Sequence, residues 1–116
     1  MMEFHSCFRY SDTRGPMKND ITVHVTARLQ ARPDTQEALR HAARALTGPT
    51  RTETGCLRYD LYEHSSEPGC FLFIEQWQTE DDLARHLQQP HIQAFIQTSA
   101  DLLAEPLQIA QWQALD

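Results

Sequence analysis

The chain has 116 residues and a formal net charge of −6, because 16 acidic residues outnumber 10 basic ones. This length fits one domain and leaves no room for a second of ordinary size. The acidic balance excludes a protein that binds nucleic-acid phosphates or an anionic membrane surface, since both need clustered cations. A composition with 41% hydrophobic and 22% charged residues is typical of a folded globular protein and excludes a disordered chain.

No apolar run approaches the length of a membrane span, and the first residues show no apolar segment that would predict a secretory leader. The cysteines, Cys7, Cys56 and Cys70, are odd in number and lack C-x-x-C spacing, so we expect reduced thiols and a cytoplasmic protein. Residues 1–18 are polar and without sustained periodicity. We predict that they form an N-terminal extension, either an appendage or a segment that packs on a partner, and that residues 19–116 form the domain.

Residues 21–30 alternate between apolar and polar side chains, which predicts a β-strand. In residues 34–46, Asp34 and Glu37 have the spacing of a capping box, and an apolar stripe of helical period follows. The stripe comprises Ala38, Leu39, Ala42, Ala45 and Leu46. We expect Pro49 to kink or end this helix, because proline lacks an N–H donor and crowds the preceding turn.

Residues 56–64 and 70–77 are predicted to form two strands, which the turn-rich loop 65–69 joins into a β-hairpin. If residue 64 lies opposite residue 70, cross-strand neighbours on one face follow directly. The predicted pairs are Leu61 with Phe73, Tyr59 with Glu75, and Leu57 with Trp77.

Thr79 and Asp82 predict the start of a second helix, which Pro90 interrupts. A third helical segment is predicted over residues 91–104 and a short last strand over residues 107–112. The order β-α-β-β-α-β is that of the split ferredoxin-like motif, an α+β fold with a four-stranded antiparallel sheet.

The strand over residues 70–77 is apolar on both faces, and such a strand is usually covered on both sides. Helices can cover one face of the sheet, so the face with Leu72, Ile74 and Tyr62 needs another cover. A second copy of the same sheet would supply it, because closed two-fold dimers are the commonest oligomers. We therefore predict a homodimer that packs sheet against sheet.

Three parts of the chain together resemble the antibiotic biosynthesis monooxygenase domain, and in particular its small quinol-monooxygenase-like members. They are Gly55-Cys56-Leu57-Arg58-Tyr59-Asp60-Leu61-Tyr62, then Glu75-Gln76-Trp77, and then Leu83 with His86-Leu87 and Pro90-His91-Ile92-Gln93-Ala94-Phe95. The resemblance extends over about residues 19–115.

This resemblance implies a dimeric α/β barrel with a pocket in each subunit between the sheet and the helices. It also implies oxidation of a bound quinol or polycyclic phenol by dioxygen with no cofactor, neither metal nor flavin, because the electron-rich substrate supplies the electrons. The haem-degrading branch of the superfamily has an Asn, a Trp and a His where this chain has Ala27, His86 and Ile96. These departures predict that the chain does not degrade haem.

Glu75, His86 and Tyr59 are the candidate catalytic residues. Glu75 lies on an apolar strand face opposite Tyr59, and burial there would raise its pKa. Such a group is either a general base or a structural carboxylate. His86 lies three residues after Leu83 and can face the sheet, where its near-neutral pKa suits proton transfer. His86 and His91 are not at the i, i+4 spacing of a helical metal site, so no metal is predicted.

Trp77, Phe73, His91 and Phe95 are the candidate substrate-binding residues, since aromatic side chains can stack on a flat ligand, although they can equally be core. The leading interpretation is a cofactor-independent monooxygenase that acts with dioxygen on a quinol-like or polyphenolic small molecule. The alternatives are a small-molecule isomerase with the same groups, and a non-catalytic dimeric module that binds an aromatic ligand.

Overall fold

The computed structural model describes residues 21–116, so the predicted extension over residues 1–18 lies outside the described residues. Three helices and four strands follow one another in the predicted order. They are β1 (Val23–Gln30), α3 (Gln36–Arg51), β2 (Cys56–Glu63), β3 (Cys70–Trp77), α4 (Glu80–Leu87), α5 (Pro90–Ser99) and β4 (Gln108–Trp112). Among the described residues, no helix is both long and apolar enough to cross a membrane.

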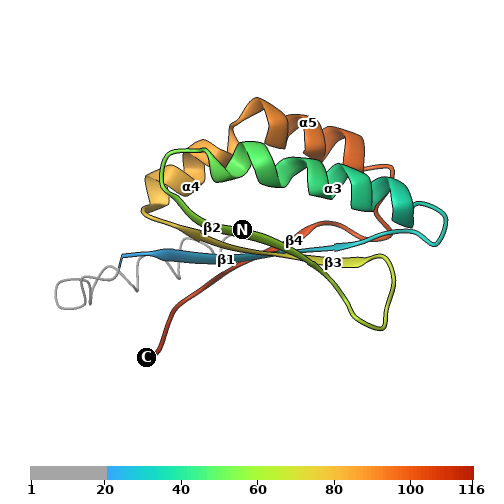
Figure 1. Ribbon diagram of the computed structural model, residues 1–116, viewed down its shortest axis with the longest axis horizontal. Helices are drawn as coiled ribbons and strands as arrows, with labels where there is room; N and C mark the ends of the chain where they lie inside the picture. Colours follow the sequence, from blue (N-terminus) through green and yellow to red (C-terminus); the bar gives the residue numbers. More distant parts are fainter. Residues whose placement is uncertain (1–20) are drawn as a thin grey trace.

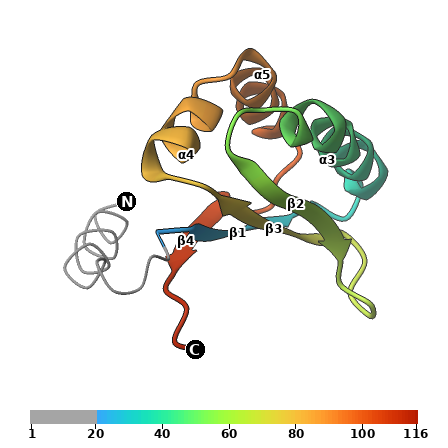
Figure 2. The same cartoon turned by 60° about the vertical axis from the view of Figure 1, so that its left-hand side comes forward.

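The strands form one antiparallel sheet in the order β2-β3-β1-β4, which confirms the α+β, ferredoxin-like prediction. All three helices lie on the same face of this sheet (Figure 1, Figure 2). The alternation in β1 explains this arrangement, because its odd-numbered residues are buried under the helices and its even-numbered ones are half-buried on the other face. The hydrophobic core therefore lies in a single layer between sheet and helices.

The hairpin register was predicted correctly over most of its length. Tyr59 pairs with Glu75 and Leu61 with Phe73. The predicted pair of Leu57 with Trp77 is wrong, because the register shifts between Cys56 and Arg58 and Cys56 takes the place opposite Trp77. Leu57 is the extra residue of this irregularity, and its side chain is 55% exposed instead of packed on the core.

Helix α3 differs from its prediction at both ends. Thr35, not Asp34, is the N-cap residue, and the Thr35 hydroxyl donates a hydrogen bond to the Leu102 carbonyl instead of capping the helix. The helix also continues through Pro49 to Arg51. Its buried face comprises Leu39, Ala43, Leu46 and Thr50, so Ala38 and Ala45 of the predicted stripe lie outside the core.

Helix α5 is shorter than the predicted segment 91–104, since it ends at Ser99. The residues after it bind the end of β1 instead of extending the helix. The Leu102 carbonyl accepts from the Arg32 amide, Ala31 and Leu103 form a β-bridge, and the Ala104 amide donates to the Gln30 carbonyl. These bonds satisfy backbone groups that a longer helix would have satisfied internally.

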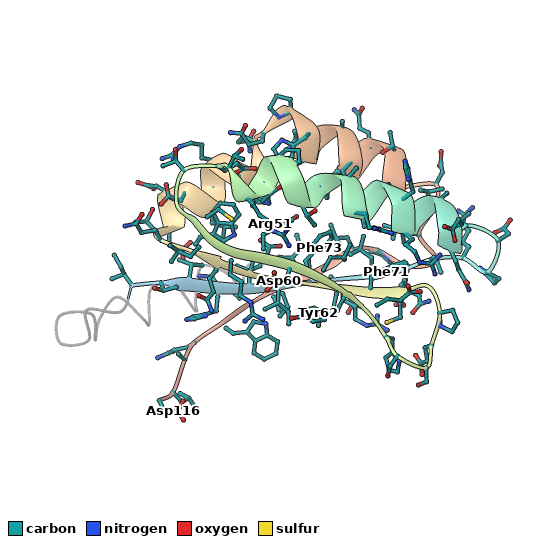
Figure 3. All side chains as sticks on the ribbon, viewed as in Figure 1. Arg51, Asp60, Tyr62, Phe71, Phe73 and Asp116 are labelled. Carbon is teal, nitrogen blue, oxygen red and sulfur yellow. The ribbon has the colours of Figure 1, made fainter. Side chains whose placement is uncertain are left out.

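No helix of residues 21–116 lies on the second face of the sheet (Figure 2). Phe71 and Phe73 lie on the helix side of the sheet, whereas Tyr62 lies on the opposite side (Figure 3). The Tyr62 and Trp112 side chains are 48% and 59% exposed. Large aromatic surface of this kind is what the predicted sheet-to-sheet homodimer would bury, and the homodimer stays a prediction.

Candidate functional site

Five of the predicted site residues meet between the sheet and helix α4. Tyr59 of β2 lies next to Glu75 of β3, and its ring centroid is 5.0 Å from that of Phe73. His86 of α4 lies over these strands, with its ring centroid 4.5 Å from that of Trp77 and 5.6 Å from that of Tyr59. The hairpin register and the position of α4 therefore bring together side chains that are up to 27 residues apart in sequence (86 − 59 = 27).

Glu75 is a buried carboxyl group with only 5% of its surface exposed. The Trp77 indole Nε1 donates a hydrogen bond of 2.9 Å to Glu75 Oε1. Burial raises the pKa of Glu75 to about 7, the indole hydrogen bond opposes the rise, and the negative charge of Glu53 adds to it. The carboxyl group therefore changes protonation state near neutral pH, which suits a general base.

Tyr59 is almost fully buried and lies beside this carboxyl group. Burial raises the pKa of its phenol far above the ordinary value, and the charge of Glu75 raises it further. A hydrogen bond with the Thr50 hydroxyl acts in the opposite direction. Tyr59 therefore stays protonated at neutral pH, where it can donate a hydrogen bond but cannot act as a base.

His86 is buried, as the spacing from Leu83 predicted, because both residues lie on the face of α4 that packs on the sheet. The helix starts with the predicted N-cap, since the Thr79 hydroxyl accepts a hydrogen bond of 3.1 Å from the Asp82 amide. Burial lowers the pKa of His86, and a hydrogen bond with Glu53 opposes this shift. His86 Nδ1 lies 3.1 Å from each carboxylate oxygen of Glu53.

Glu53 is a candidate site residue that the sequence interpretation missed. It lies in the turn between α3 and β2, where Gly55 adopts a φ of +82° that favours glycine. Glu53 Oε2 lies 2.9 Å from His91 Nε2, and the same nitrogen lies 3.1 Å from the Thr50 hydroxyl. No sequence signal distinguishes Glu53 from the other acidic residues in turns, since only the folded turn brings it between the two histidines.

A surface pocket of about 420 Å³ opens where α3, α4 and α5 converge. It is lined by Pro49, Thr52, Glu53, Thr54, Asp82, Arg85, Gln89 and His91. Of the predicted site residues, His91 lines this pocket, whereas Glu75 and His86 are buried and are not among its lining residues. Glu53 connects the two groups, since it lines the pocket and contacts the buried His86.

Phe95, the remaining predicted residue, belongs to the hydrophobic core on the buried face of α5. Within residues 21–116, it forms none of the ring pairs that join Tyr59, Phe73, Trp77, His86 and His91. Its packing accords with the alternative interpretation of a core side chain, and a role in substrate binding stays a prediction.

Glu53, His86 and His91 are the described residues that could hold a metal ion, because one donor atom from each lies within 4.8 Å of the others. The sequence predicted no metal site, since the histidines lack helical ligand spacing. They nevertheless converge, with ring centroids 6.4 Å apart, because Pro90 starts a new helix at α5 and redirects the chain. The cysteines Cys56 and Cys70 are both free thiols.

Known proteins share this sequence pattern and fold. The sequence model of the family described as "Antibiotic biosynthesis monooxygenase" matches residues 22–98. An uncharacterised protein of Synechocystis is 34% identical over 90 residues, which are 78% of this chain and 61% of that protein, so the chain spans less than two thirds of this relative. The protein of Mycobacterium tuberculosis named "Putative monooxygenase Rv0793" is 36% identical over 81% of this chain and 92% of that protein.

Solved structures agree with the sequence matches. The crystal structure of PA3566 from Pseudomonas aeruginosa superimposes with a TM-score of 0.78 at 34% identity, over 83% of this chain and 96% of that one. The structure of Rv0793 superimposes with a TM-score of 0.77 at 35% identity, over 82% of this chain and 96% of that one. The sequence match over residues 22–98, together with these superpositions, shows that the chain belongs to the antibiotic biosynthesis monooxygenase family.

Proposed function

We propose that the chain is a cofactor-independent monooxygenase that oxidises a quinol-like or polyphenolic small molecule with dioxygen. The observation that carries this proposal is the buried carboxyl group of Glu75, whose pKa of about 7 lies near that of a working general base. Of the two candidate bases, Glu75 is favoured over His86, because burial lowers the pKa of His86, which weakens it as a base, and its Nδ1 already pairs with the Glu53 carboxylate.

In this proposal, Glu75 accepts the proton of a phenolic hydroxyl group of the substrate. The resulting anion is electron-rich, and it transfers its electrons to dioxygen. One oxygen atom is incorporated into the substrate and the other leaves as water, so the substrate supplies all the electrons that the reaction needs. Glu75 is only 5% exposed, so the transfer that turns its carboxylate and the phenol into a neutral carboxyl group and a phenolate needs little reorganisation of water.

The aromatic side chains around Glu75 fit a flat substrate. Trp77 and Phe73 would stack on its rings, and the protonated Tyr59 hydroxyl would donate a hydrogen bond that orients it. His91 and Phe95 would contact the substrate from the side of α5. His91 lines the pocket, so this pocket is the proposed entrance, and the side chains between it and Glu75 would have to move as the substrate enters.

We also propose that the working unit is a homodimer in which the two sheets pack together through the faces opposite α3, α4 and α5. The exposed Tyr62 and Trp112 on that face support this arrangement. Light scattering after size exclusion tests it. A mass of two chains that falls towards one chain in Tyr62→Asp supports the interface, and a single-chain mass for the unaltered protein at high concentration contradicts it.

Oxygen consumption tests the proposed reaction. The purified chain is mixed with a naphthoquinol or an anthrone-type phenol in an oxygen electrode, in parallel with Glu75→Gln and the control Glu67→Gln in the exposed hairpin loop. We expect enzymatic oxygen uptake that Glu75→Gln abolishes and Glu67→Gln preserves. Uptake that is equal in all three proteins, or bound substrate that is isomerised or left unchanged without oxygen uptake, would contradict the proposal.

A further inference from the structure

We infer that Glu53, His86 and His91 form a binding site for one divalent transition-metal ion of the Zn²⁺ class, in the wall of the pocket between α3, α4 and α5. The site goes beyond the proposed oxidation and does not rest on it. Each ligand comes from a different segment: the turn before β2, the buried face of α4 and the first turn of α5.

The spacing of the donor atoms is that of ligands around a single ion. Glu53 Oε2 lies 3.1 Å from His86 Nδ1 and 2.9 Å from His91 Nε2. Ligand bonds of about 2.1 Å at angles between octahedral and tetrahedral place neighbouring donors about 3.0 to 3.4 Å apart. Two of the three donor pairs therefore already have about this spacing, and the donor atoms of His86 and His91 lie within 4.8 Å of each other. A bound ion would replace the contacts of both histidines with Glu53 and the hydrogen bond between His91 Nε2 and Thr50.

The chemistry of the donors selects the class of ion. Two imidazole nitrogens and one carboxylate oxygen suit zinc and its neighbours, whereas magnesium and calcium prefer sets made only of oxygen atoms. Two histidines with one glutamate are also the protein ligands of many catalytic zinc sites, which keep further positions open for water or substrate.

The surroundings provide both access and charge balance. Glu53 and His91 line the pocket, so an ion held between them is reachable from solvent. Asp82 lies in the same wall, and its charge is balanced by a salt bridge of 2.8 Å to Arg85. The Glu53 carboxylate therefore remains the group that can offset the charge of a bound cation beside the two histidines.

The burial of the ligands favours a fixed site over a loose surface one. The His86 side chain is 3% exposed and that of Glu53 11% exposed. His86 is held between Trp77 and Tyr59, whose ring centroids lie 4.5 Å and 5.6 Å away. Ligands that are held in position by packing lose little conformational freedom on binding, which strengthens the site.

Zinc binding tests the inference directly. Protein freed of metal with a chelator is titrated with ZnCl₂ by calorimetry, alongside Glu53→Gln, His91→Ala and the control His41→Ala on the exposed side of α3. We expect each ligand variant to bind zinc about tenfold or more weakly and His41→Ala to bind as the unaltered protein does, because three side chains supply all the protein ligands. Circular dichroism checks that the variants are folded, and Glu53→Gln is the gentler change because it preserves shape and hydrogen bonding.

A second measurement reports the position of the ion. Trp112→Phe removes the exposed indole, so that fluorescence comes from Trp77 beside His86. In this background, Co²⁺ should quench the emission with saturation at one ion per chain, and Glu53→Gln should move the midpoint of this quenching to a Co²⁺ concentration about tenfold or more higher.

Equal zinc affinity in all variants, together with no saturable quenching, would overturn the inference and leave a hydrogen-bonded His–Glu–His cluster only. The outcome is separate from that of the proposed oxidation. Oxygen consumption by chelator-treated protein would support the oxidation without the metal and would not bear against zinc binding. Zinc binding by a protein that consumes no oxygen would support the metal site and refute the oxidation alone.

Discussion

Replacing Glu75 with glutamine should change how the stability of the protein depends on pH. Burial raises the pKa of Glu75 from 4.5 to about 7, so the folded protein holds this proton more tightly than the unfolded chain does. Well below pH 4.5 the group is protonated in both the folded and the unfolded state, so it does not change the free energy of unfolding. As the pH rises from 4.5 towards 7, only the unfolded chain loses the proton readily, and the free energy of unfolding falls. A shift of this size corresponds to a loss of about 3 kcal/mol in the free energy of unfolding.

Glu75→Gln keeps an oxygen acceptor for the Trp77 indole but removes the ionisation. The difference in unfolding free energy between the variant and the unaltered protein should therefore move in favour of the variant by about 3 kcal/mol between pH 4.5 and pH 8. Urea denaturation at several pH values, followed by circular dichroism, measures this difference. The pH-independent part of this difference reflects only the cost of burying the amide in place of the carboxyl group. A difference in unfolding free energy that does not change with pH would therefore refute the reasoning, whatever its absolute value.

Three further substitutions test the packing around the site by urea denaturation. Gly55→Ala should destabilise the fold by about 1 kcal/mol or more, because Gly55 has a positive φ and a Cβ atom there would overlap Asp82. Gly48→Ala meets no neighbour and should stabilise α3 by about 0.5–1 kcal/mol. Equal effects of the two substitutions would contradict this reasoning. Thr50→Val should cost about 1–2 kcal/mol and Thr50→Ser less, since only valine removes the buried hydroxyl and its hydrogen bonds with His91 and with the buried Tyr59; the reverse order would be inconsistent with that network. Leu39→Ala should cost about 2–5 kcal/mol and the exposed Leu57→Ala about 0.5 kcal/mol or less; similar losses would show that the two burials are misassigned.

The fold was largely predictable because the strands carry a strong local signal. The alternation of β1 and the five-residue loop of the hairpin fix which residues share a face, and so they placed Tyr59 next to Glu75. The irregularity at Leu57 was not predictable, because a bulge adds a residue without changing the apolar pattern. The length of α5 was also missed, since the backbone partners of residues 102–104 lie on the distant end of β1.

The candidate site was predictable only where regular structure carries its residues. Helical spacing from Leu83 correctly predicted that His86 faces the sheet. Glu53 and the convergence of His91 on it depend on the turn at Gly55 and on the change of direction at Pro90. Such turns combine short segments in three dimensions, and neither periodicity nor residue spacing encodes where their side chains meet.

The protonation of Glu75 is the central claim, and a carbon-13 NMR titration of its side-chain carboxyl carbon tests it most directly. The signal is assigned by its disappearance in Glu75→Gln and followed from pH 3 to pH 9. The structure predicts a midpoint near pH 7. A midpoint near 4.5, the ordinary value for a glutamate, would contradict the account of a buried carboxyl group that acts as a base.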